Sequence, residues 1–477
     1  MKGKSYMKKK LVALGMASVM AASLAACGSS SGSSTSAAED TAATEQTTAA
    51  VASTEADTVA TESTAEGSDL TADLTLWTYP VGNWGDSATV DSLISDFNAK
   101  YPGIKVTVEY LDYTNGDDQV NTAIEGGQAP DLVLEGPERL VANWGARGLM
   151  VDLSDLMSGD SASDLYDTIR SACTASDGKV YEYPLCMVAH CMAINRNMFE
   201  KADALQYLDE ENHTWNSTED FLKAVQAVYD SGQTDVAAVY CAGQGGDQGT
   251  RALVNNMYGG TFTNADHTAY TVSSDENNKA LKALYDQNGI NFDASLVGGD
   301  EINLFRQGVL AMSLCWNASQ QNNTDNNDAG LTNDGDTILP MAFPTESGDA
   351  KLCGGIWGFG IFDNGDENKI AAAKTFIDFM CNDGTEASKA VLAAGFFPVH
   401  QNMGNVYEGT DTADTMQMFT DYFMPKMGDY YQVTPGWAEA RTAWWNMLQS
   451  IGTGSDIPTE TANFDTTANA ALAAATS

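Results

Sequence analysis

Positions 74–79 read Leu-Thr-Leu-Trp-Thr-Tyr, a short run in which alternate side chains fall on opposite sides. Such alternation predicts a β-strand. Apolar residues at helical spacing follow at 90–101, and Pro102-Gly103 ends that helix. A second alternating run at 104–110, a polar helix and a buried run at 131–134 come next. This order of strands and helices predicts an α/β domain.

The same order returns later in the chain. Amphipathic helices are predicted after Ser217, closing at Gly232, and over 370–380, ending at Gly384. Buried strands are predicted at 236–241, 311–316 and 356–362. The Asn- and Asp-rich run at 322–336 lacks the residue pattern of a calcium loop, so a solvated loop is expected there.

The N-terminus has the pattern of an export signal. A lysine-rich head precedes a short apolar run at 11–22 and the sequence Leu-Ala-Ala before Cys27. The apolar run is too short to span a membrane, which takes about 20 residues. We therefore predict a signal peptide at 1–26. The cysteine directly after Leu-Ala-Ala resembles the lipobox of bacterial lipoproteins, and this resemblance implies cleavage before Cys27 and its lipidation.

Residues 27–69 are predicted to form the lipidated cysteine and a disordered linker. From 28 onward the linker is nearly all Ser, Thr, Ala and Glu, a composition that cannot offset the entropy cost of ordering. The remaining chain, roughly 400 residues long, exceeds what one hydrophobic core usually holds. Two domains are therefore expected.

Charge and cysteine content exclude several classes of protein. The chain carries 24 basic and 65 acidic residues, a net charge of −41, which argues against a nucleic-acid partner. Seven cysteines follow Cys27: Cys173, Cys186, Cys191, Cys241, Cys315, Cys353 and Cys381. An odd number cannot be fully paired, and without a Cys-x-x-Cys or a Cys/His cluster no zinc site is expected. No metal or cofactor is predicted for this chain.

Several segments together resemble the extracellular solute-binding proteins of family 1, the maltose-binding-protein-like sugar-binding components of ABC importers. The matching segments are 74–77, 101–109, 129–133, 178–184, 195–199, 305–308, 311–312 and 354–355. The resemblance implies an α/β, periplasmic-binding-protein type II fold. In that fold two lobes close on a ligand cleft about a hinge. Lobe one is predicted at 70–186 plus 340–399, and lobe two at 187–339 plus 400–477.

Sugar binding requires flat aromatic surfaces and polar groups that donate and accept hydrogen bonds in a plane. Glu138 and Arg139 match an acidic residue and an arginine that hydrogen-bond sugar in a relative, with Glu in place of Asp. Glu135 stands where that relative has an aromatic contact, which argues against maltodextrin as the ligand. Trp437, ahead of Arg-Thr-Ala, matches a stacking tryptophan.

For the other candidates two roles are open, lining the cleft or packing within a lobe: Trp357, Trp84, Tyr79, Trp316, Asn317, Asp247 and Gln248. Glycines before Trp357 would permit a ligand to approach closely. Trp444 and Trp445 are expected in the core.

The resemblance implies a binding protein that captures a mono- or oligosaccharide and delivers it to membrane permease subunits driven by a cytoplasmic ATPase. We expect a monomer, lipid-anchored at the extracellular face of the cytoplasmic membrane, or periplasmic if the cell has an outer membrane. Glu135 and Glu138 lie too close on one loop for a glycosidase pair, so catalysis is not expected.

Three alternatives to sugar binding remain open: a ferric-ion importer component, a polyamine importer component and a surface adhesin. Tyr430-Tyr431 resembles the iron-binding pair of ferric-ion importers, and polyamine binders also combine aromatic and acidic residues. A surface adhesin would share the anchor.

Overall fold

A computed structural model describes residues 70–113, 115–241, 243, 246–293, 295–296 and 298–476. All of them belong to one compact unit, residues 65–477. The predicted signal peptide, Cys27 and the linker up to 69 lie outside the described residues.

One sheet organises the described chain. Its strands follow the order β10-β4-β11-β3-β1-β2, and β9 and β12 pair with β4. Their bounds are β1 (Ala72–Thr78), β2 (Ile104–Tyr110), β3 (Leu132–Glu135), β4 (Tyr183–Asn195), β9 (Met312–Trp316), β10 (Ile338–Met341), β11 (Cys353–Ile361) and β12 (Phe397–Pro398). The strands predicted at 74–79, 104–110, 131–134, 311–316 and 356–362 are confirmed, apart from shifts of a few residues at their ends.

In the first lobe β1 pairs in parallel with β2 and β3, and helices cover the sheet. These helices are α1 (Ser87–Lys100), α2 (Gly116–Glu125), α3 (Pro137–Arg139), α4 (Ser154–Met157), α5 (Asp167–Ala172), α12 (Glu367–Asn382) and α13 (Gly384–Ala394), with the turns η2 (Gly82–Gly85), η3 (Leu140–Gly145) and η4 (Asp160–Ala162). Phe97 of α1 packs against Phe376 and Phe379 of α12, which joins the two helices in the core. The prediction missed α13, which begins at Gly384 where α12 was expected only to end.

The second lobe contains the C-terminal half of β4 with β9 and β10, two small ladders and most of the remaining helices. The ladders are β5 (Leu208–Asp209) with β6 (Thr214–Trp215), and β7 (Ala238–Cys241) with β8 (Ile290–Asp293). The helices and turns are α6 (Arg196–Lys201), η5 (Leu205–Tyr207), α7 (Thr218–Asp230), α8 (Asp247–Tyr258), α9 (Asp275–Asp286), α10 (Gly298–Arg306), α11 (Ala318–Asn322), α14 (Ala413–Tyr422), η6 (Met424–Lys426), η7 (Tyr431–Val433), α15 (Trp437–Gly452) and α16 (Ile457–Ala475). Ser217 caps α7 as predicted, since its side chain accepts a hydrogen bond from the Asp220 amide.

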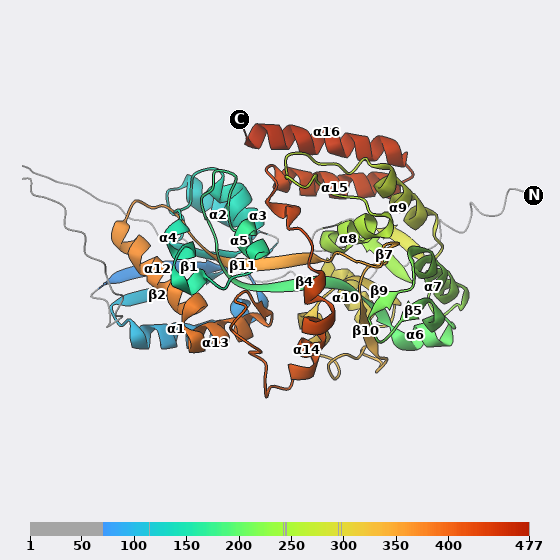
Figure 1. Ribbon diagram of the computed structural model, residues 1–477, viewed down its shortest axis with the longest axis horizontal. Helices are drawn as coiled ribbons and strands as arrows, with labels where there is room; N and C mark the ends of the chain where they lie inside the picture. Colours follow the sequence, from blue (N-terminus) through green and yellow to red (C-terminus); the bar gives the residue numbers. More distant parts are fainter. Residues whose placement is uncertain are drawn as a thin grey trace, which may run out of the picture. The chain divides into compact units, whose positions relative to one another are not determined.

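Strands β4 and β11 connect the two lobes. Figure 1 shows them side by side, running from the group of α1, α2 and α12 toward the group of α7, α8 and α9. All residues of β4 are buried. The predicted lobe boundaries after 186 and 339 fall inside β4 and β10, and the lobe boundaries stay a prediction.

The cysteines resolved with their side chains are free and buried: Cys173, Cys186, Cys191, Cys315, Cys353 and Cys381. They lie in the apolar interior, where a thiol behaves as a small hydrophobe. No helix in the described part of the chain is both long and apolar enough to cross a membrane.

Candidate functional site

The first-lobe half of the site is built around Arg139. Strand β3 ends at Glu135, and α3 returns Arg139 toward it, so that Arg139 Nη1 donates to Glu135 Oε1 at 2.6 Å. Arg139 Nε donates to Asp117 Oδ1 of α2, also at 2.6 Å. The turn requires glycine at 136, because a Cβ there would lie 2.8 Å from the Ile356 carbonyl oxygen. Arg139 is thus held on two sides by the carboxyl groups of Glu135 and Asp117.

Two tyrosine rings lie against this guanidinium. The centroids of Tyr79 and Tyr113 are 5.4 Å apart in a stacked pair, and the Arg139 guanidinium lies 5.1 Å from the Tyr79 centroid. The Tyr79 hydroxyl donates to Asp117 Oδ1 at 2.5 Å. Tyr79 is fully buried, whereas Tyr113 is 39% exposed and Asp117 is also exposed. The cluster therefore reaches solvent at Tyr113 and Asp117, two residues that the sequence analysis missed.

The second-lobe half is built around Asp247, at the start of α8. Asp247 accepts from Arg251, one turn later, and from Arg441 Nε at 2.8 Å and Nη2 at 3.0 Å. Asp247 and Arg251 are fully buried. Burial alone would raise the pKa of Asp247, but the two guanidinium groups hold it below its usual range. Asp247 is therefore ionised and paired.

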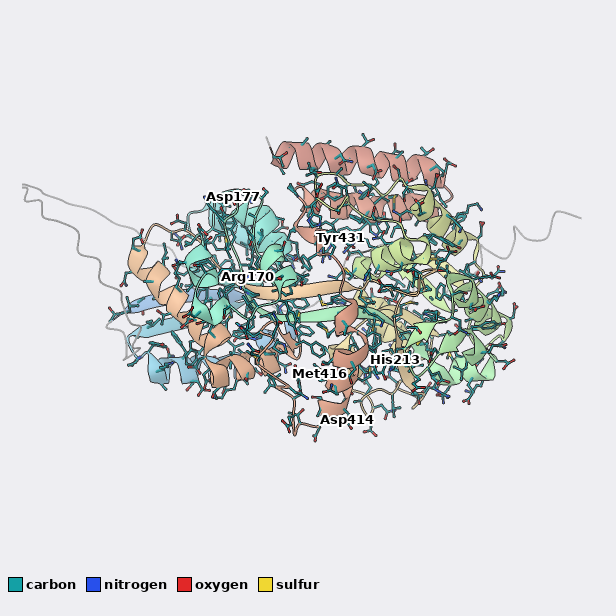
Figure 2. All side chains as sticks on the ribbon, viewed as in Figure 1. Arg170, Asp177, His213, Asp414, Met416 and Tyr431 are labelled. Atoms are coloured by element: carbon teal, nitrogen blue, oxygen red, sulfur yellow. The ribbon has the colours of Figure 1, made fainter. Side chains whose placement is uncertain are left out.

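Trp437 is in an aromatic cage beside this ion pair. It opens α15, and its ring lies 4.8 Å from the Arg251 guanidinium, 5.7 Å from Phe262 and 5.9 Å from Tyr431. Figure 2 shows Tyr431 between α15 and β11. The Tyr431 hydroxyl accepts from Arg251 Nε at 3.1 Å. Phe262 and Arg251 are further residues that the sequence analysis did not assign to the site, and it named Tyr431 only in the ferric-ion alternative.

The two halves face each other. Tyr430 directly precedes η7, and its hydroxyl donates to Glu138 Oε2 of α3 at 2.8 Å. The positive charge of Arg441, in the second lobe, acts to lower the pKa of Glu135 and of Asp117 in the first lobe. At Glu135 burial outweighs this effect. The structure thus brings Glu135, Glu138, Arg139, Tyr79, Asp247 and Trp437 into one polar and aromatic cluster.

Several buried polar atoms of the cluster and its surroundings have no hydrogen-bond partner among the described residues. They are Glu135 Oε2, both carboxylate oxygens of Glu182, both ring nitrogens of His190 and Trp437 Nε1. Burial raises the pKa of Glu135 to about 8 despite Arg139, raises that of Glu182 well above its usual value, and lowers that of His190 to about 4. Burial therefore favours the neutral forms of these groups. Unpaired buried polar atoms call for a ligand or water that would satisfy them.

The structure gives most of the other predicted site residues packing or capping roles, and Gln248 lies next to the cluster. Trp84 is fully buried and donates to the Ala390 carbonyl, and Trp316 is fully buried and donates to Gln321. Asn317 caps α11 through its side-chain oxygen. Trp357 is half-buried and stacks on Phe396, with centroids 4.7 Å apart. Gln248, also half-buried, follows Asp247 on α8.

Two cavities adjoin the cluster, one at Tyr430 and the other at Tyr431. A cavity of about 580 Å³ is lined by Tyr430 together with Val141, Ala172 and His267. Another, of about 630 Å³, is lined by Tyr431 and Phe262. No group of three or more His, Cys, Asp or Glu side chains in the described ranges is arranged to hold a metal ion.

Comparison with known proteins agrees with this architecture. A putative binding protein of Brucella abortus is 26% identical over 378 residues, which cover 76% of this chain and 84% of that protein. A maltooligosaccharide ABC transporter solute-binding lipoprotein of Streptococcus pneumoniae is 31% identical over 113 residues, 24% of this chain and 25% of the relative.

Among solved structures, the GacH receptor of Streptomyces glaucescens, crystallised unliganded and with acarbose, has a TM-score of 0.66. It is 17% identical, and the match covers 85% of this chain and 99% of the receptor, which shows the shared two-lobed fold. The family model described as bacterial extracellular solute-binding protein matches residues 82–387. The chain therefore belongs to the bacterial extracellular solute-binding protein family.

Proposed function

We propose that this protein captures a carbohydrate in the cluster between its lobes and delivers it to an ABC importer. The observation that carries the proposal is the composition of the cluster. Carboxylates and guanidinium groups of both lobes lie beside the rings of Tyr79, Tyr113 and Trp437, and Glu135 Oε2 and Trp437 Nε1 remain unpaired. Sugar hydroxyls would pair with the polar groups, and the C–H face of a sugar ring would pack on an aromatic ring.

The charge balance of the cluster favours an uncharged ligand. Arg139, Arg251 and Arg441 stand against Asp117, Glu138 and Asp247, while burial favours the neutral forms of Glu135 and Glu182. A charged ligand would disturb this balance in a buried setting, where an unpaired charge is costly. The names of the pneumococcal relative and of the acarbose-bound receptor, both of which refer to saccharide-type ligands, support the same class.

The chain is a binding protein and not an enzyme, as its family shows. We propose that Trp437, Glu135, Glu138, Arg139, Tyr79 and Asp247 contact or position the ligand, with Gln248 at the edge. Trp84, Trp316 and Asn317 instead pack or cap elements within a lobe. Trp357 is assigned to its stack on Phe396.

The finer cellular assignments rest on the sequence and on relatives. The family places the protein outside the cytoplasm. We propose a monomer that is lipid-anchored at Cys27 and that meets permease subunits coupled to a cytoplasmic ATPase. The lipoprotein name of the pneumococcal relative supports the anchor.

Ferric iron is disfavoured by the tyrosine pair itself. The hydroxyls of Tyr430 and Tyr431 have different partners, Glu138 and Arg251. Burial raises the pKa of both phenols, which opposes the phenolate form that iron requires. The Arg251 cation would also repel a metal ion. Polyamine binding and adhesion remain outcomes of the test.

The test is thermal unfolding and calorimetry of the purified chain with mono- and oligosaccharides, polyamines and ferric iron. A ligand present at 100 times its dissociation constant should stabilise the folded state by about 2.7 kcal/mol. Trp437→Phe should weaken saccharide binding, since it removes the unpaired N–H, while Tyr229→Phe, on an exposed part of α7, should not. Stabilisation by a polyamine or iron alone would refute the carbohydrate assignment. No stabilisation by any ligand would favour the adhesin.

A further inference from the structure

Trp445 lies on the same face of α15 as two residues of the cluster. Trp437, Arg441 and Trp445 are spaced at i, i+4 and i+8, which places them in one row along the helix. The row spans about 12 Å at 1.5 Å per residue. The Arg441 guanidinium lies 5.4 Å from the Trp445 centroid while it holds Asp247. Arg441 therefore links the second tryptophan to the ion-pair network.

Trp445 differs from its neighbour Trp444. Trp444 is fully buried and donates its indole N–H to Thr250 Oγ1, as a core tryptophan should. Trp445 is half-buried, and its indole nitrogen is shielded from solvent without a partner in the described part of the chain. Trp437 has the same unpaired N–H. The two ends of the row thus share an unsatisfied donor beside an aromatic face.

The row of Trp437, Arg441 and Trp445 belongs to a helix that lies near the first lobe. Helix α15 lies close to the turn η3, and the Arg441 charge acts on Glu135 and Asp117. On α2, Asp117 is exposed and feels the charge of Arg441, so the first lobe offers a polar side chain near the middle of the row. A ligand lying along α15 would meet rings on one side and polar groups on the other.

We infer that Trp445 is a second stacking surface for the ligand, and that the ligand is an oligosaccharide extending along α15 from Trp437. One sugar ring is shorter than the row, so it could not reach both tryptophans. The inference rests on the proposed carbohydrate function. It goes beyond it by assigning a residue and by requiring several linked rings.

The experiment measures affinity by calorimetry for saccharides of one to five rings, in gluco-, manno-, xylo-, galacto- and fructo-series, with the full purified chain. Trp445→Ala should weaken binding of the longer members about tenfold. It should leave binding of members that reach only Trp437 within about twofold. Trp445→Phe keeps an aromatic face and should restore most of the lost affinity.

Asn446→Ala is the matched control, because Asn446 lines the groove between α15 and α16 on another face of the helix. It should bind every member like the wild type. Circular dichroism and melting curves check that each variant is folded. Equal losses at all lengths after Trp445→Ala would show a structural role and overturn the inference, as would no loss at any length. Wild-type binding confined to single rings would overturn it while the carbohydrate function stands. A wild type that binds no saccharide would refute both.

Discussion

Asp247 and Glu135 are both buried carboxylates at the ends of the same cluster, yet their pKa values shift in opposite directions. Burial opposes ionisation of both groups; at Asp247 two guanidinium groups outweigh it, whereas at Glu135 burial, helped by the charges of Glu138 and Asp117, outweighs Arg139. The number and sign of neighbouring charges therefore decide the state of each residue. The ionised Asp247 holds Arg251 and Arg441 in place, whereas burial favours the protonated form of Glu135.

The variant Asp247→Asn should destabilise the protein by about 3–5 kcal/mol, because it leaves two guanidinium groups without their buried counter-charge. Urea unfolding measures the change. Asp349→Asn removes an exposed partner of Lys351 and should change the free energy of unfolding by less than about 1 kcal/mol. A similar small loss for Asp247→Asn would show that the buried network is not formed.

At the scale of elements, the site depends on how closely helices approach strands. Helix α8 carries Asp247 and Arg251, and it packs against β9 at Gly249. A Cβ at Gly249 would lie 1.8 Å from the Leu314 carbonyl oxygen. A close backbone contact also positions helix α15, since a Cβ at Gly436, just before Trp437, would lie 2.6 Å from the backbone of α16. Backbone contacts at these two glycines therefore position the charged and aromatic residues of the second lobe.

The variant Gly249→Ala should destabilise the chain by about 1–3 kcal/mol, because α8 must move away from β9 to admit the methyl group. It should also weaken ligand binding, since Asp247 and Arg251 move with the helix. Gly384→Ala, in the first turn of α13 with open space around it, should be neutral or stabilising by up to about 1 kcal/mol. Thermal unfolding and calorimetry would measure both effects. Equal stability of the two variants would contradict the close contact of α8 with β9.

For the whole molecule, buried acids in both lobes make stability depend on pH. Burial raises the pKa of Glu135 to about 8 and that of Glu301, on α10, to about 7, from a usual value of 4.5. Each acid holds its proton more tightly in the folded chain than in the unfolded chain. The unfolded chain therefore binds fewer protons between these values, and stability falls as pH rises through this range.

The free energy of unfolding should consequently decrease from about pH 6.5 to about pH 8 and then level off with respect to these two groups. The window begins at about pH 6.5 because burial lowers the pKa of His190 from 6.5 to about 4, so His190 makes stability rise with pH only between those two values. Glu301→Gln should flatten the profile up to about pH 7, and Glu135→Gln should flatten it up to about pH 8. Denaturant titrations at several pH values measure the slopes, with the exposed Glu346→Gln as control. A wild-type profile that rises over this window would contradict the assignment.

Local sequence pattern was sufficient for much of the fold. Alternation at 74–79 and 104–110 and helical spacing at 90–101 correspond to β1, β2 and α1, because these patterns record which face of an element is buried. The segments resembling the solute-binding family also identified the architecture that the family match shows. Helix α13 was missed because its start at Gly384 has the appearance of a helix end.

The sequence by itself therefore determined the order of strands and helices and the family, whereas the roles of Glu138, Arg139 and Trp437 at the ligand stay a prediction. Only the tertiary structure decided which side chains meet. Tyr430 reaches Glu138 across 292 positions, and Arg441 reaches Asp247 across 194. It also separated Trp445, which is half-buried, from Trp84, Trp316, Trp437 and Trp444, which are buried. The physical reason is that periodicity reports burial along one element, whereas a site depends on contacts between elements that are distant in the sequence.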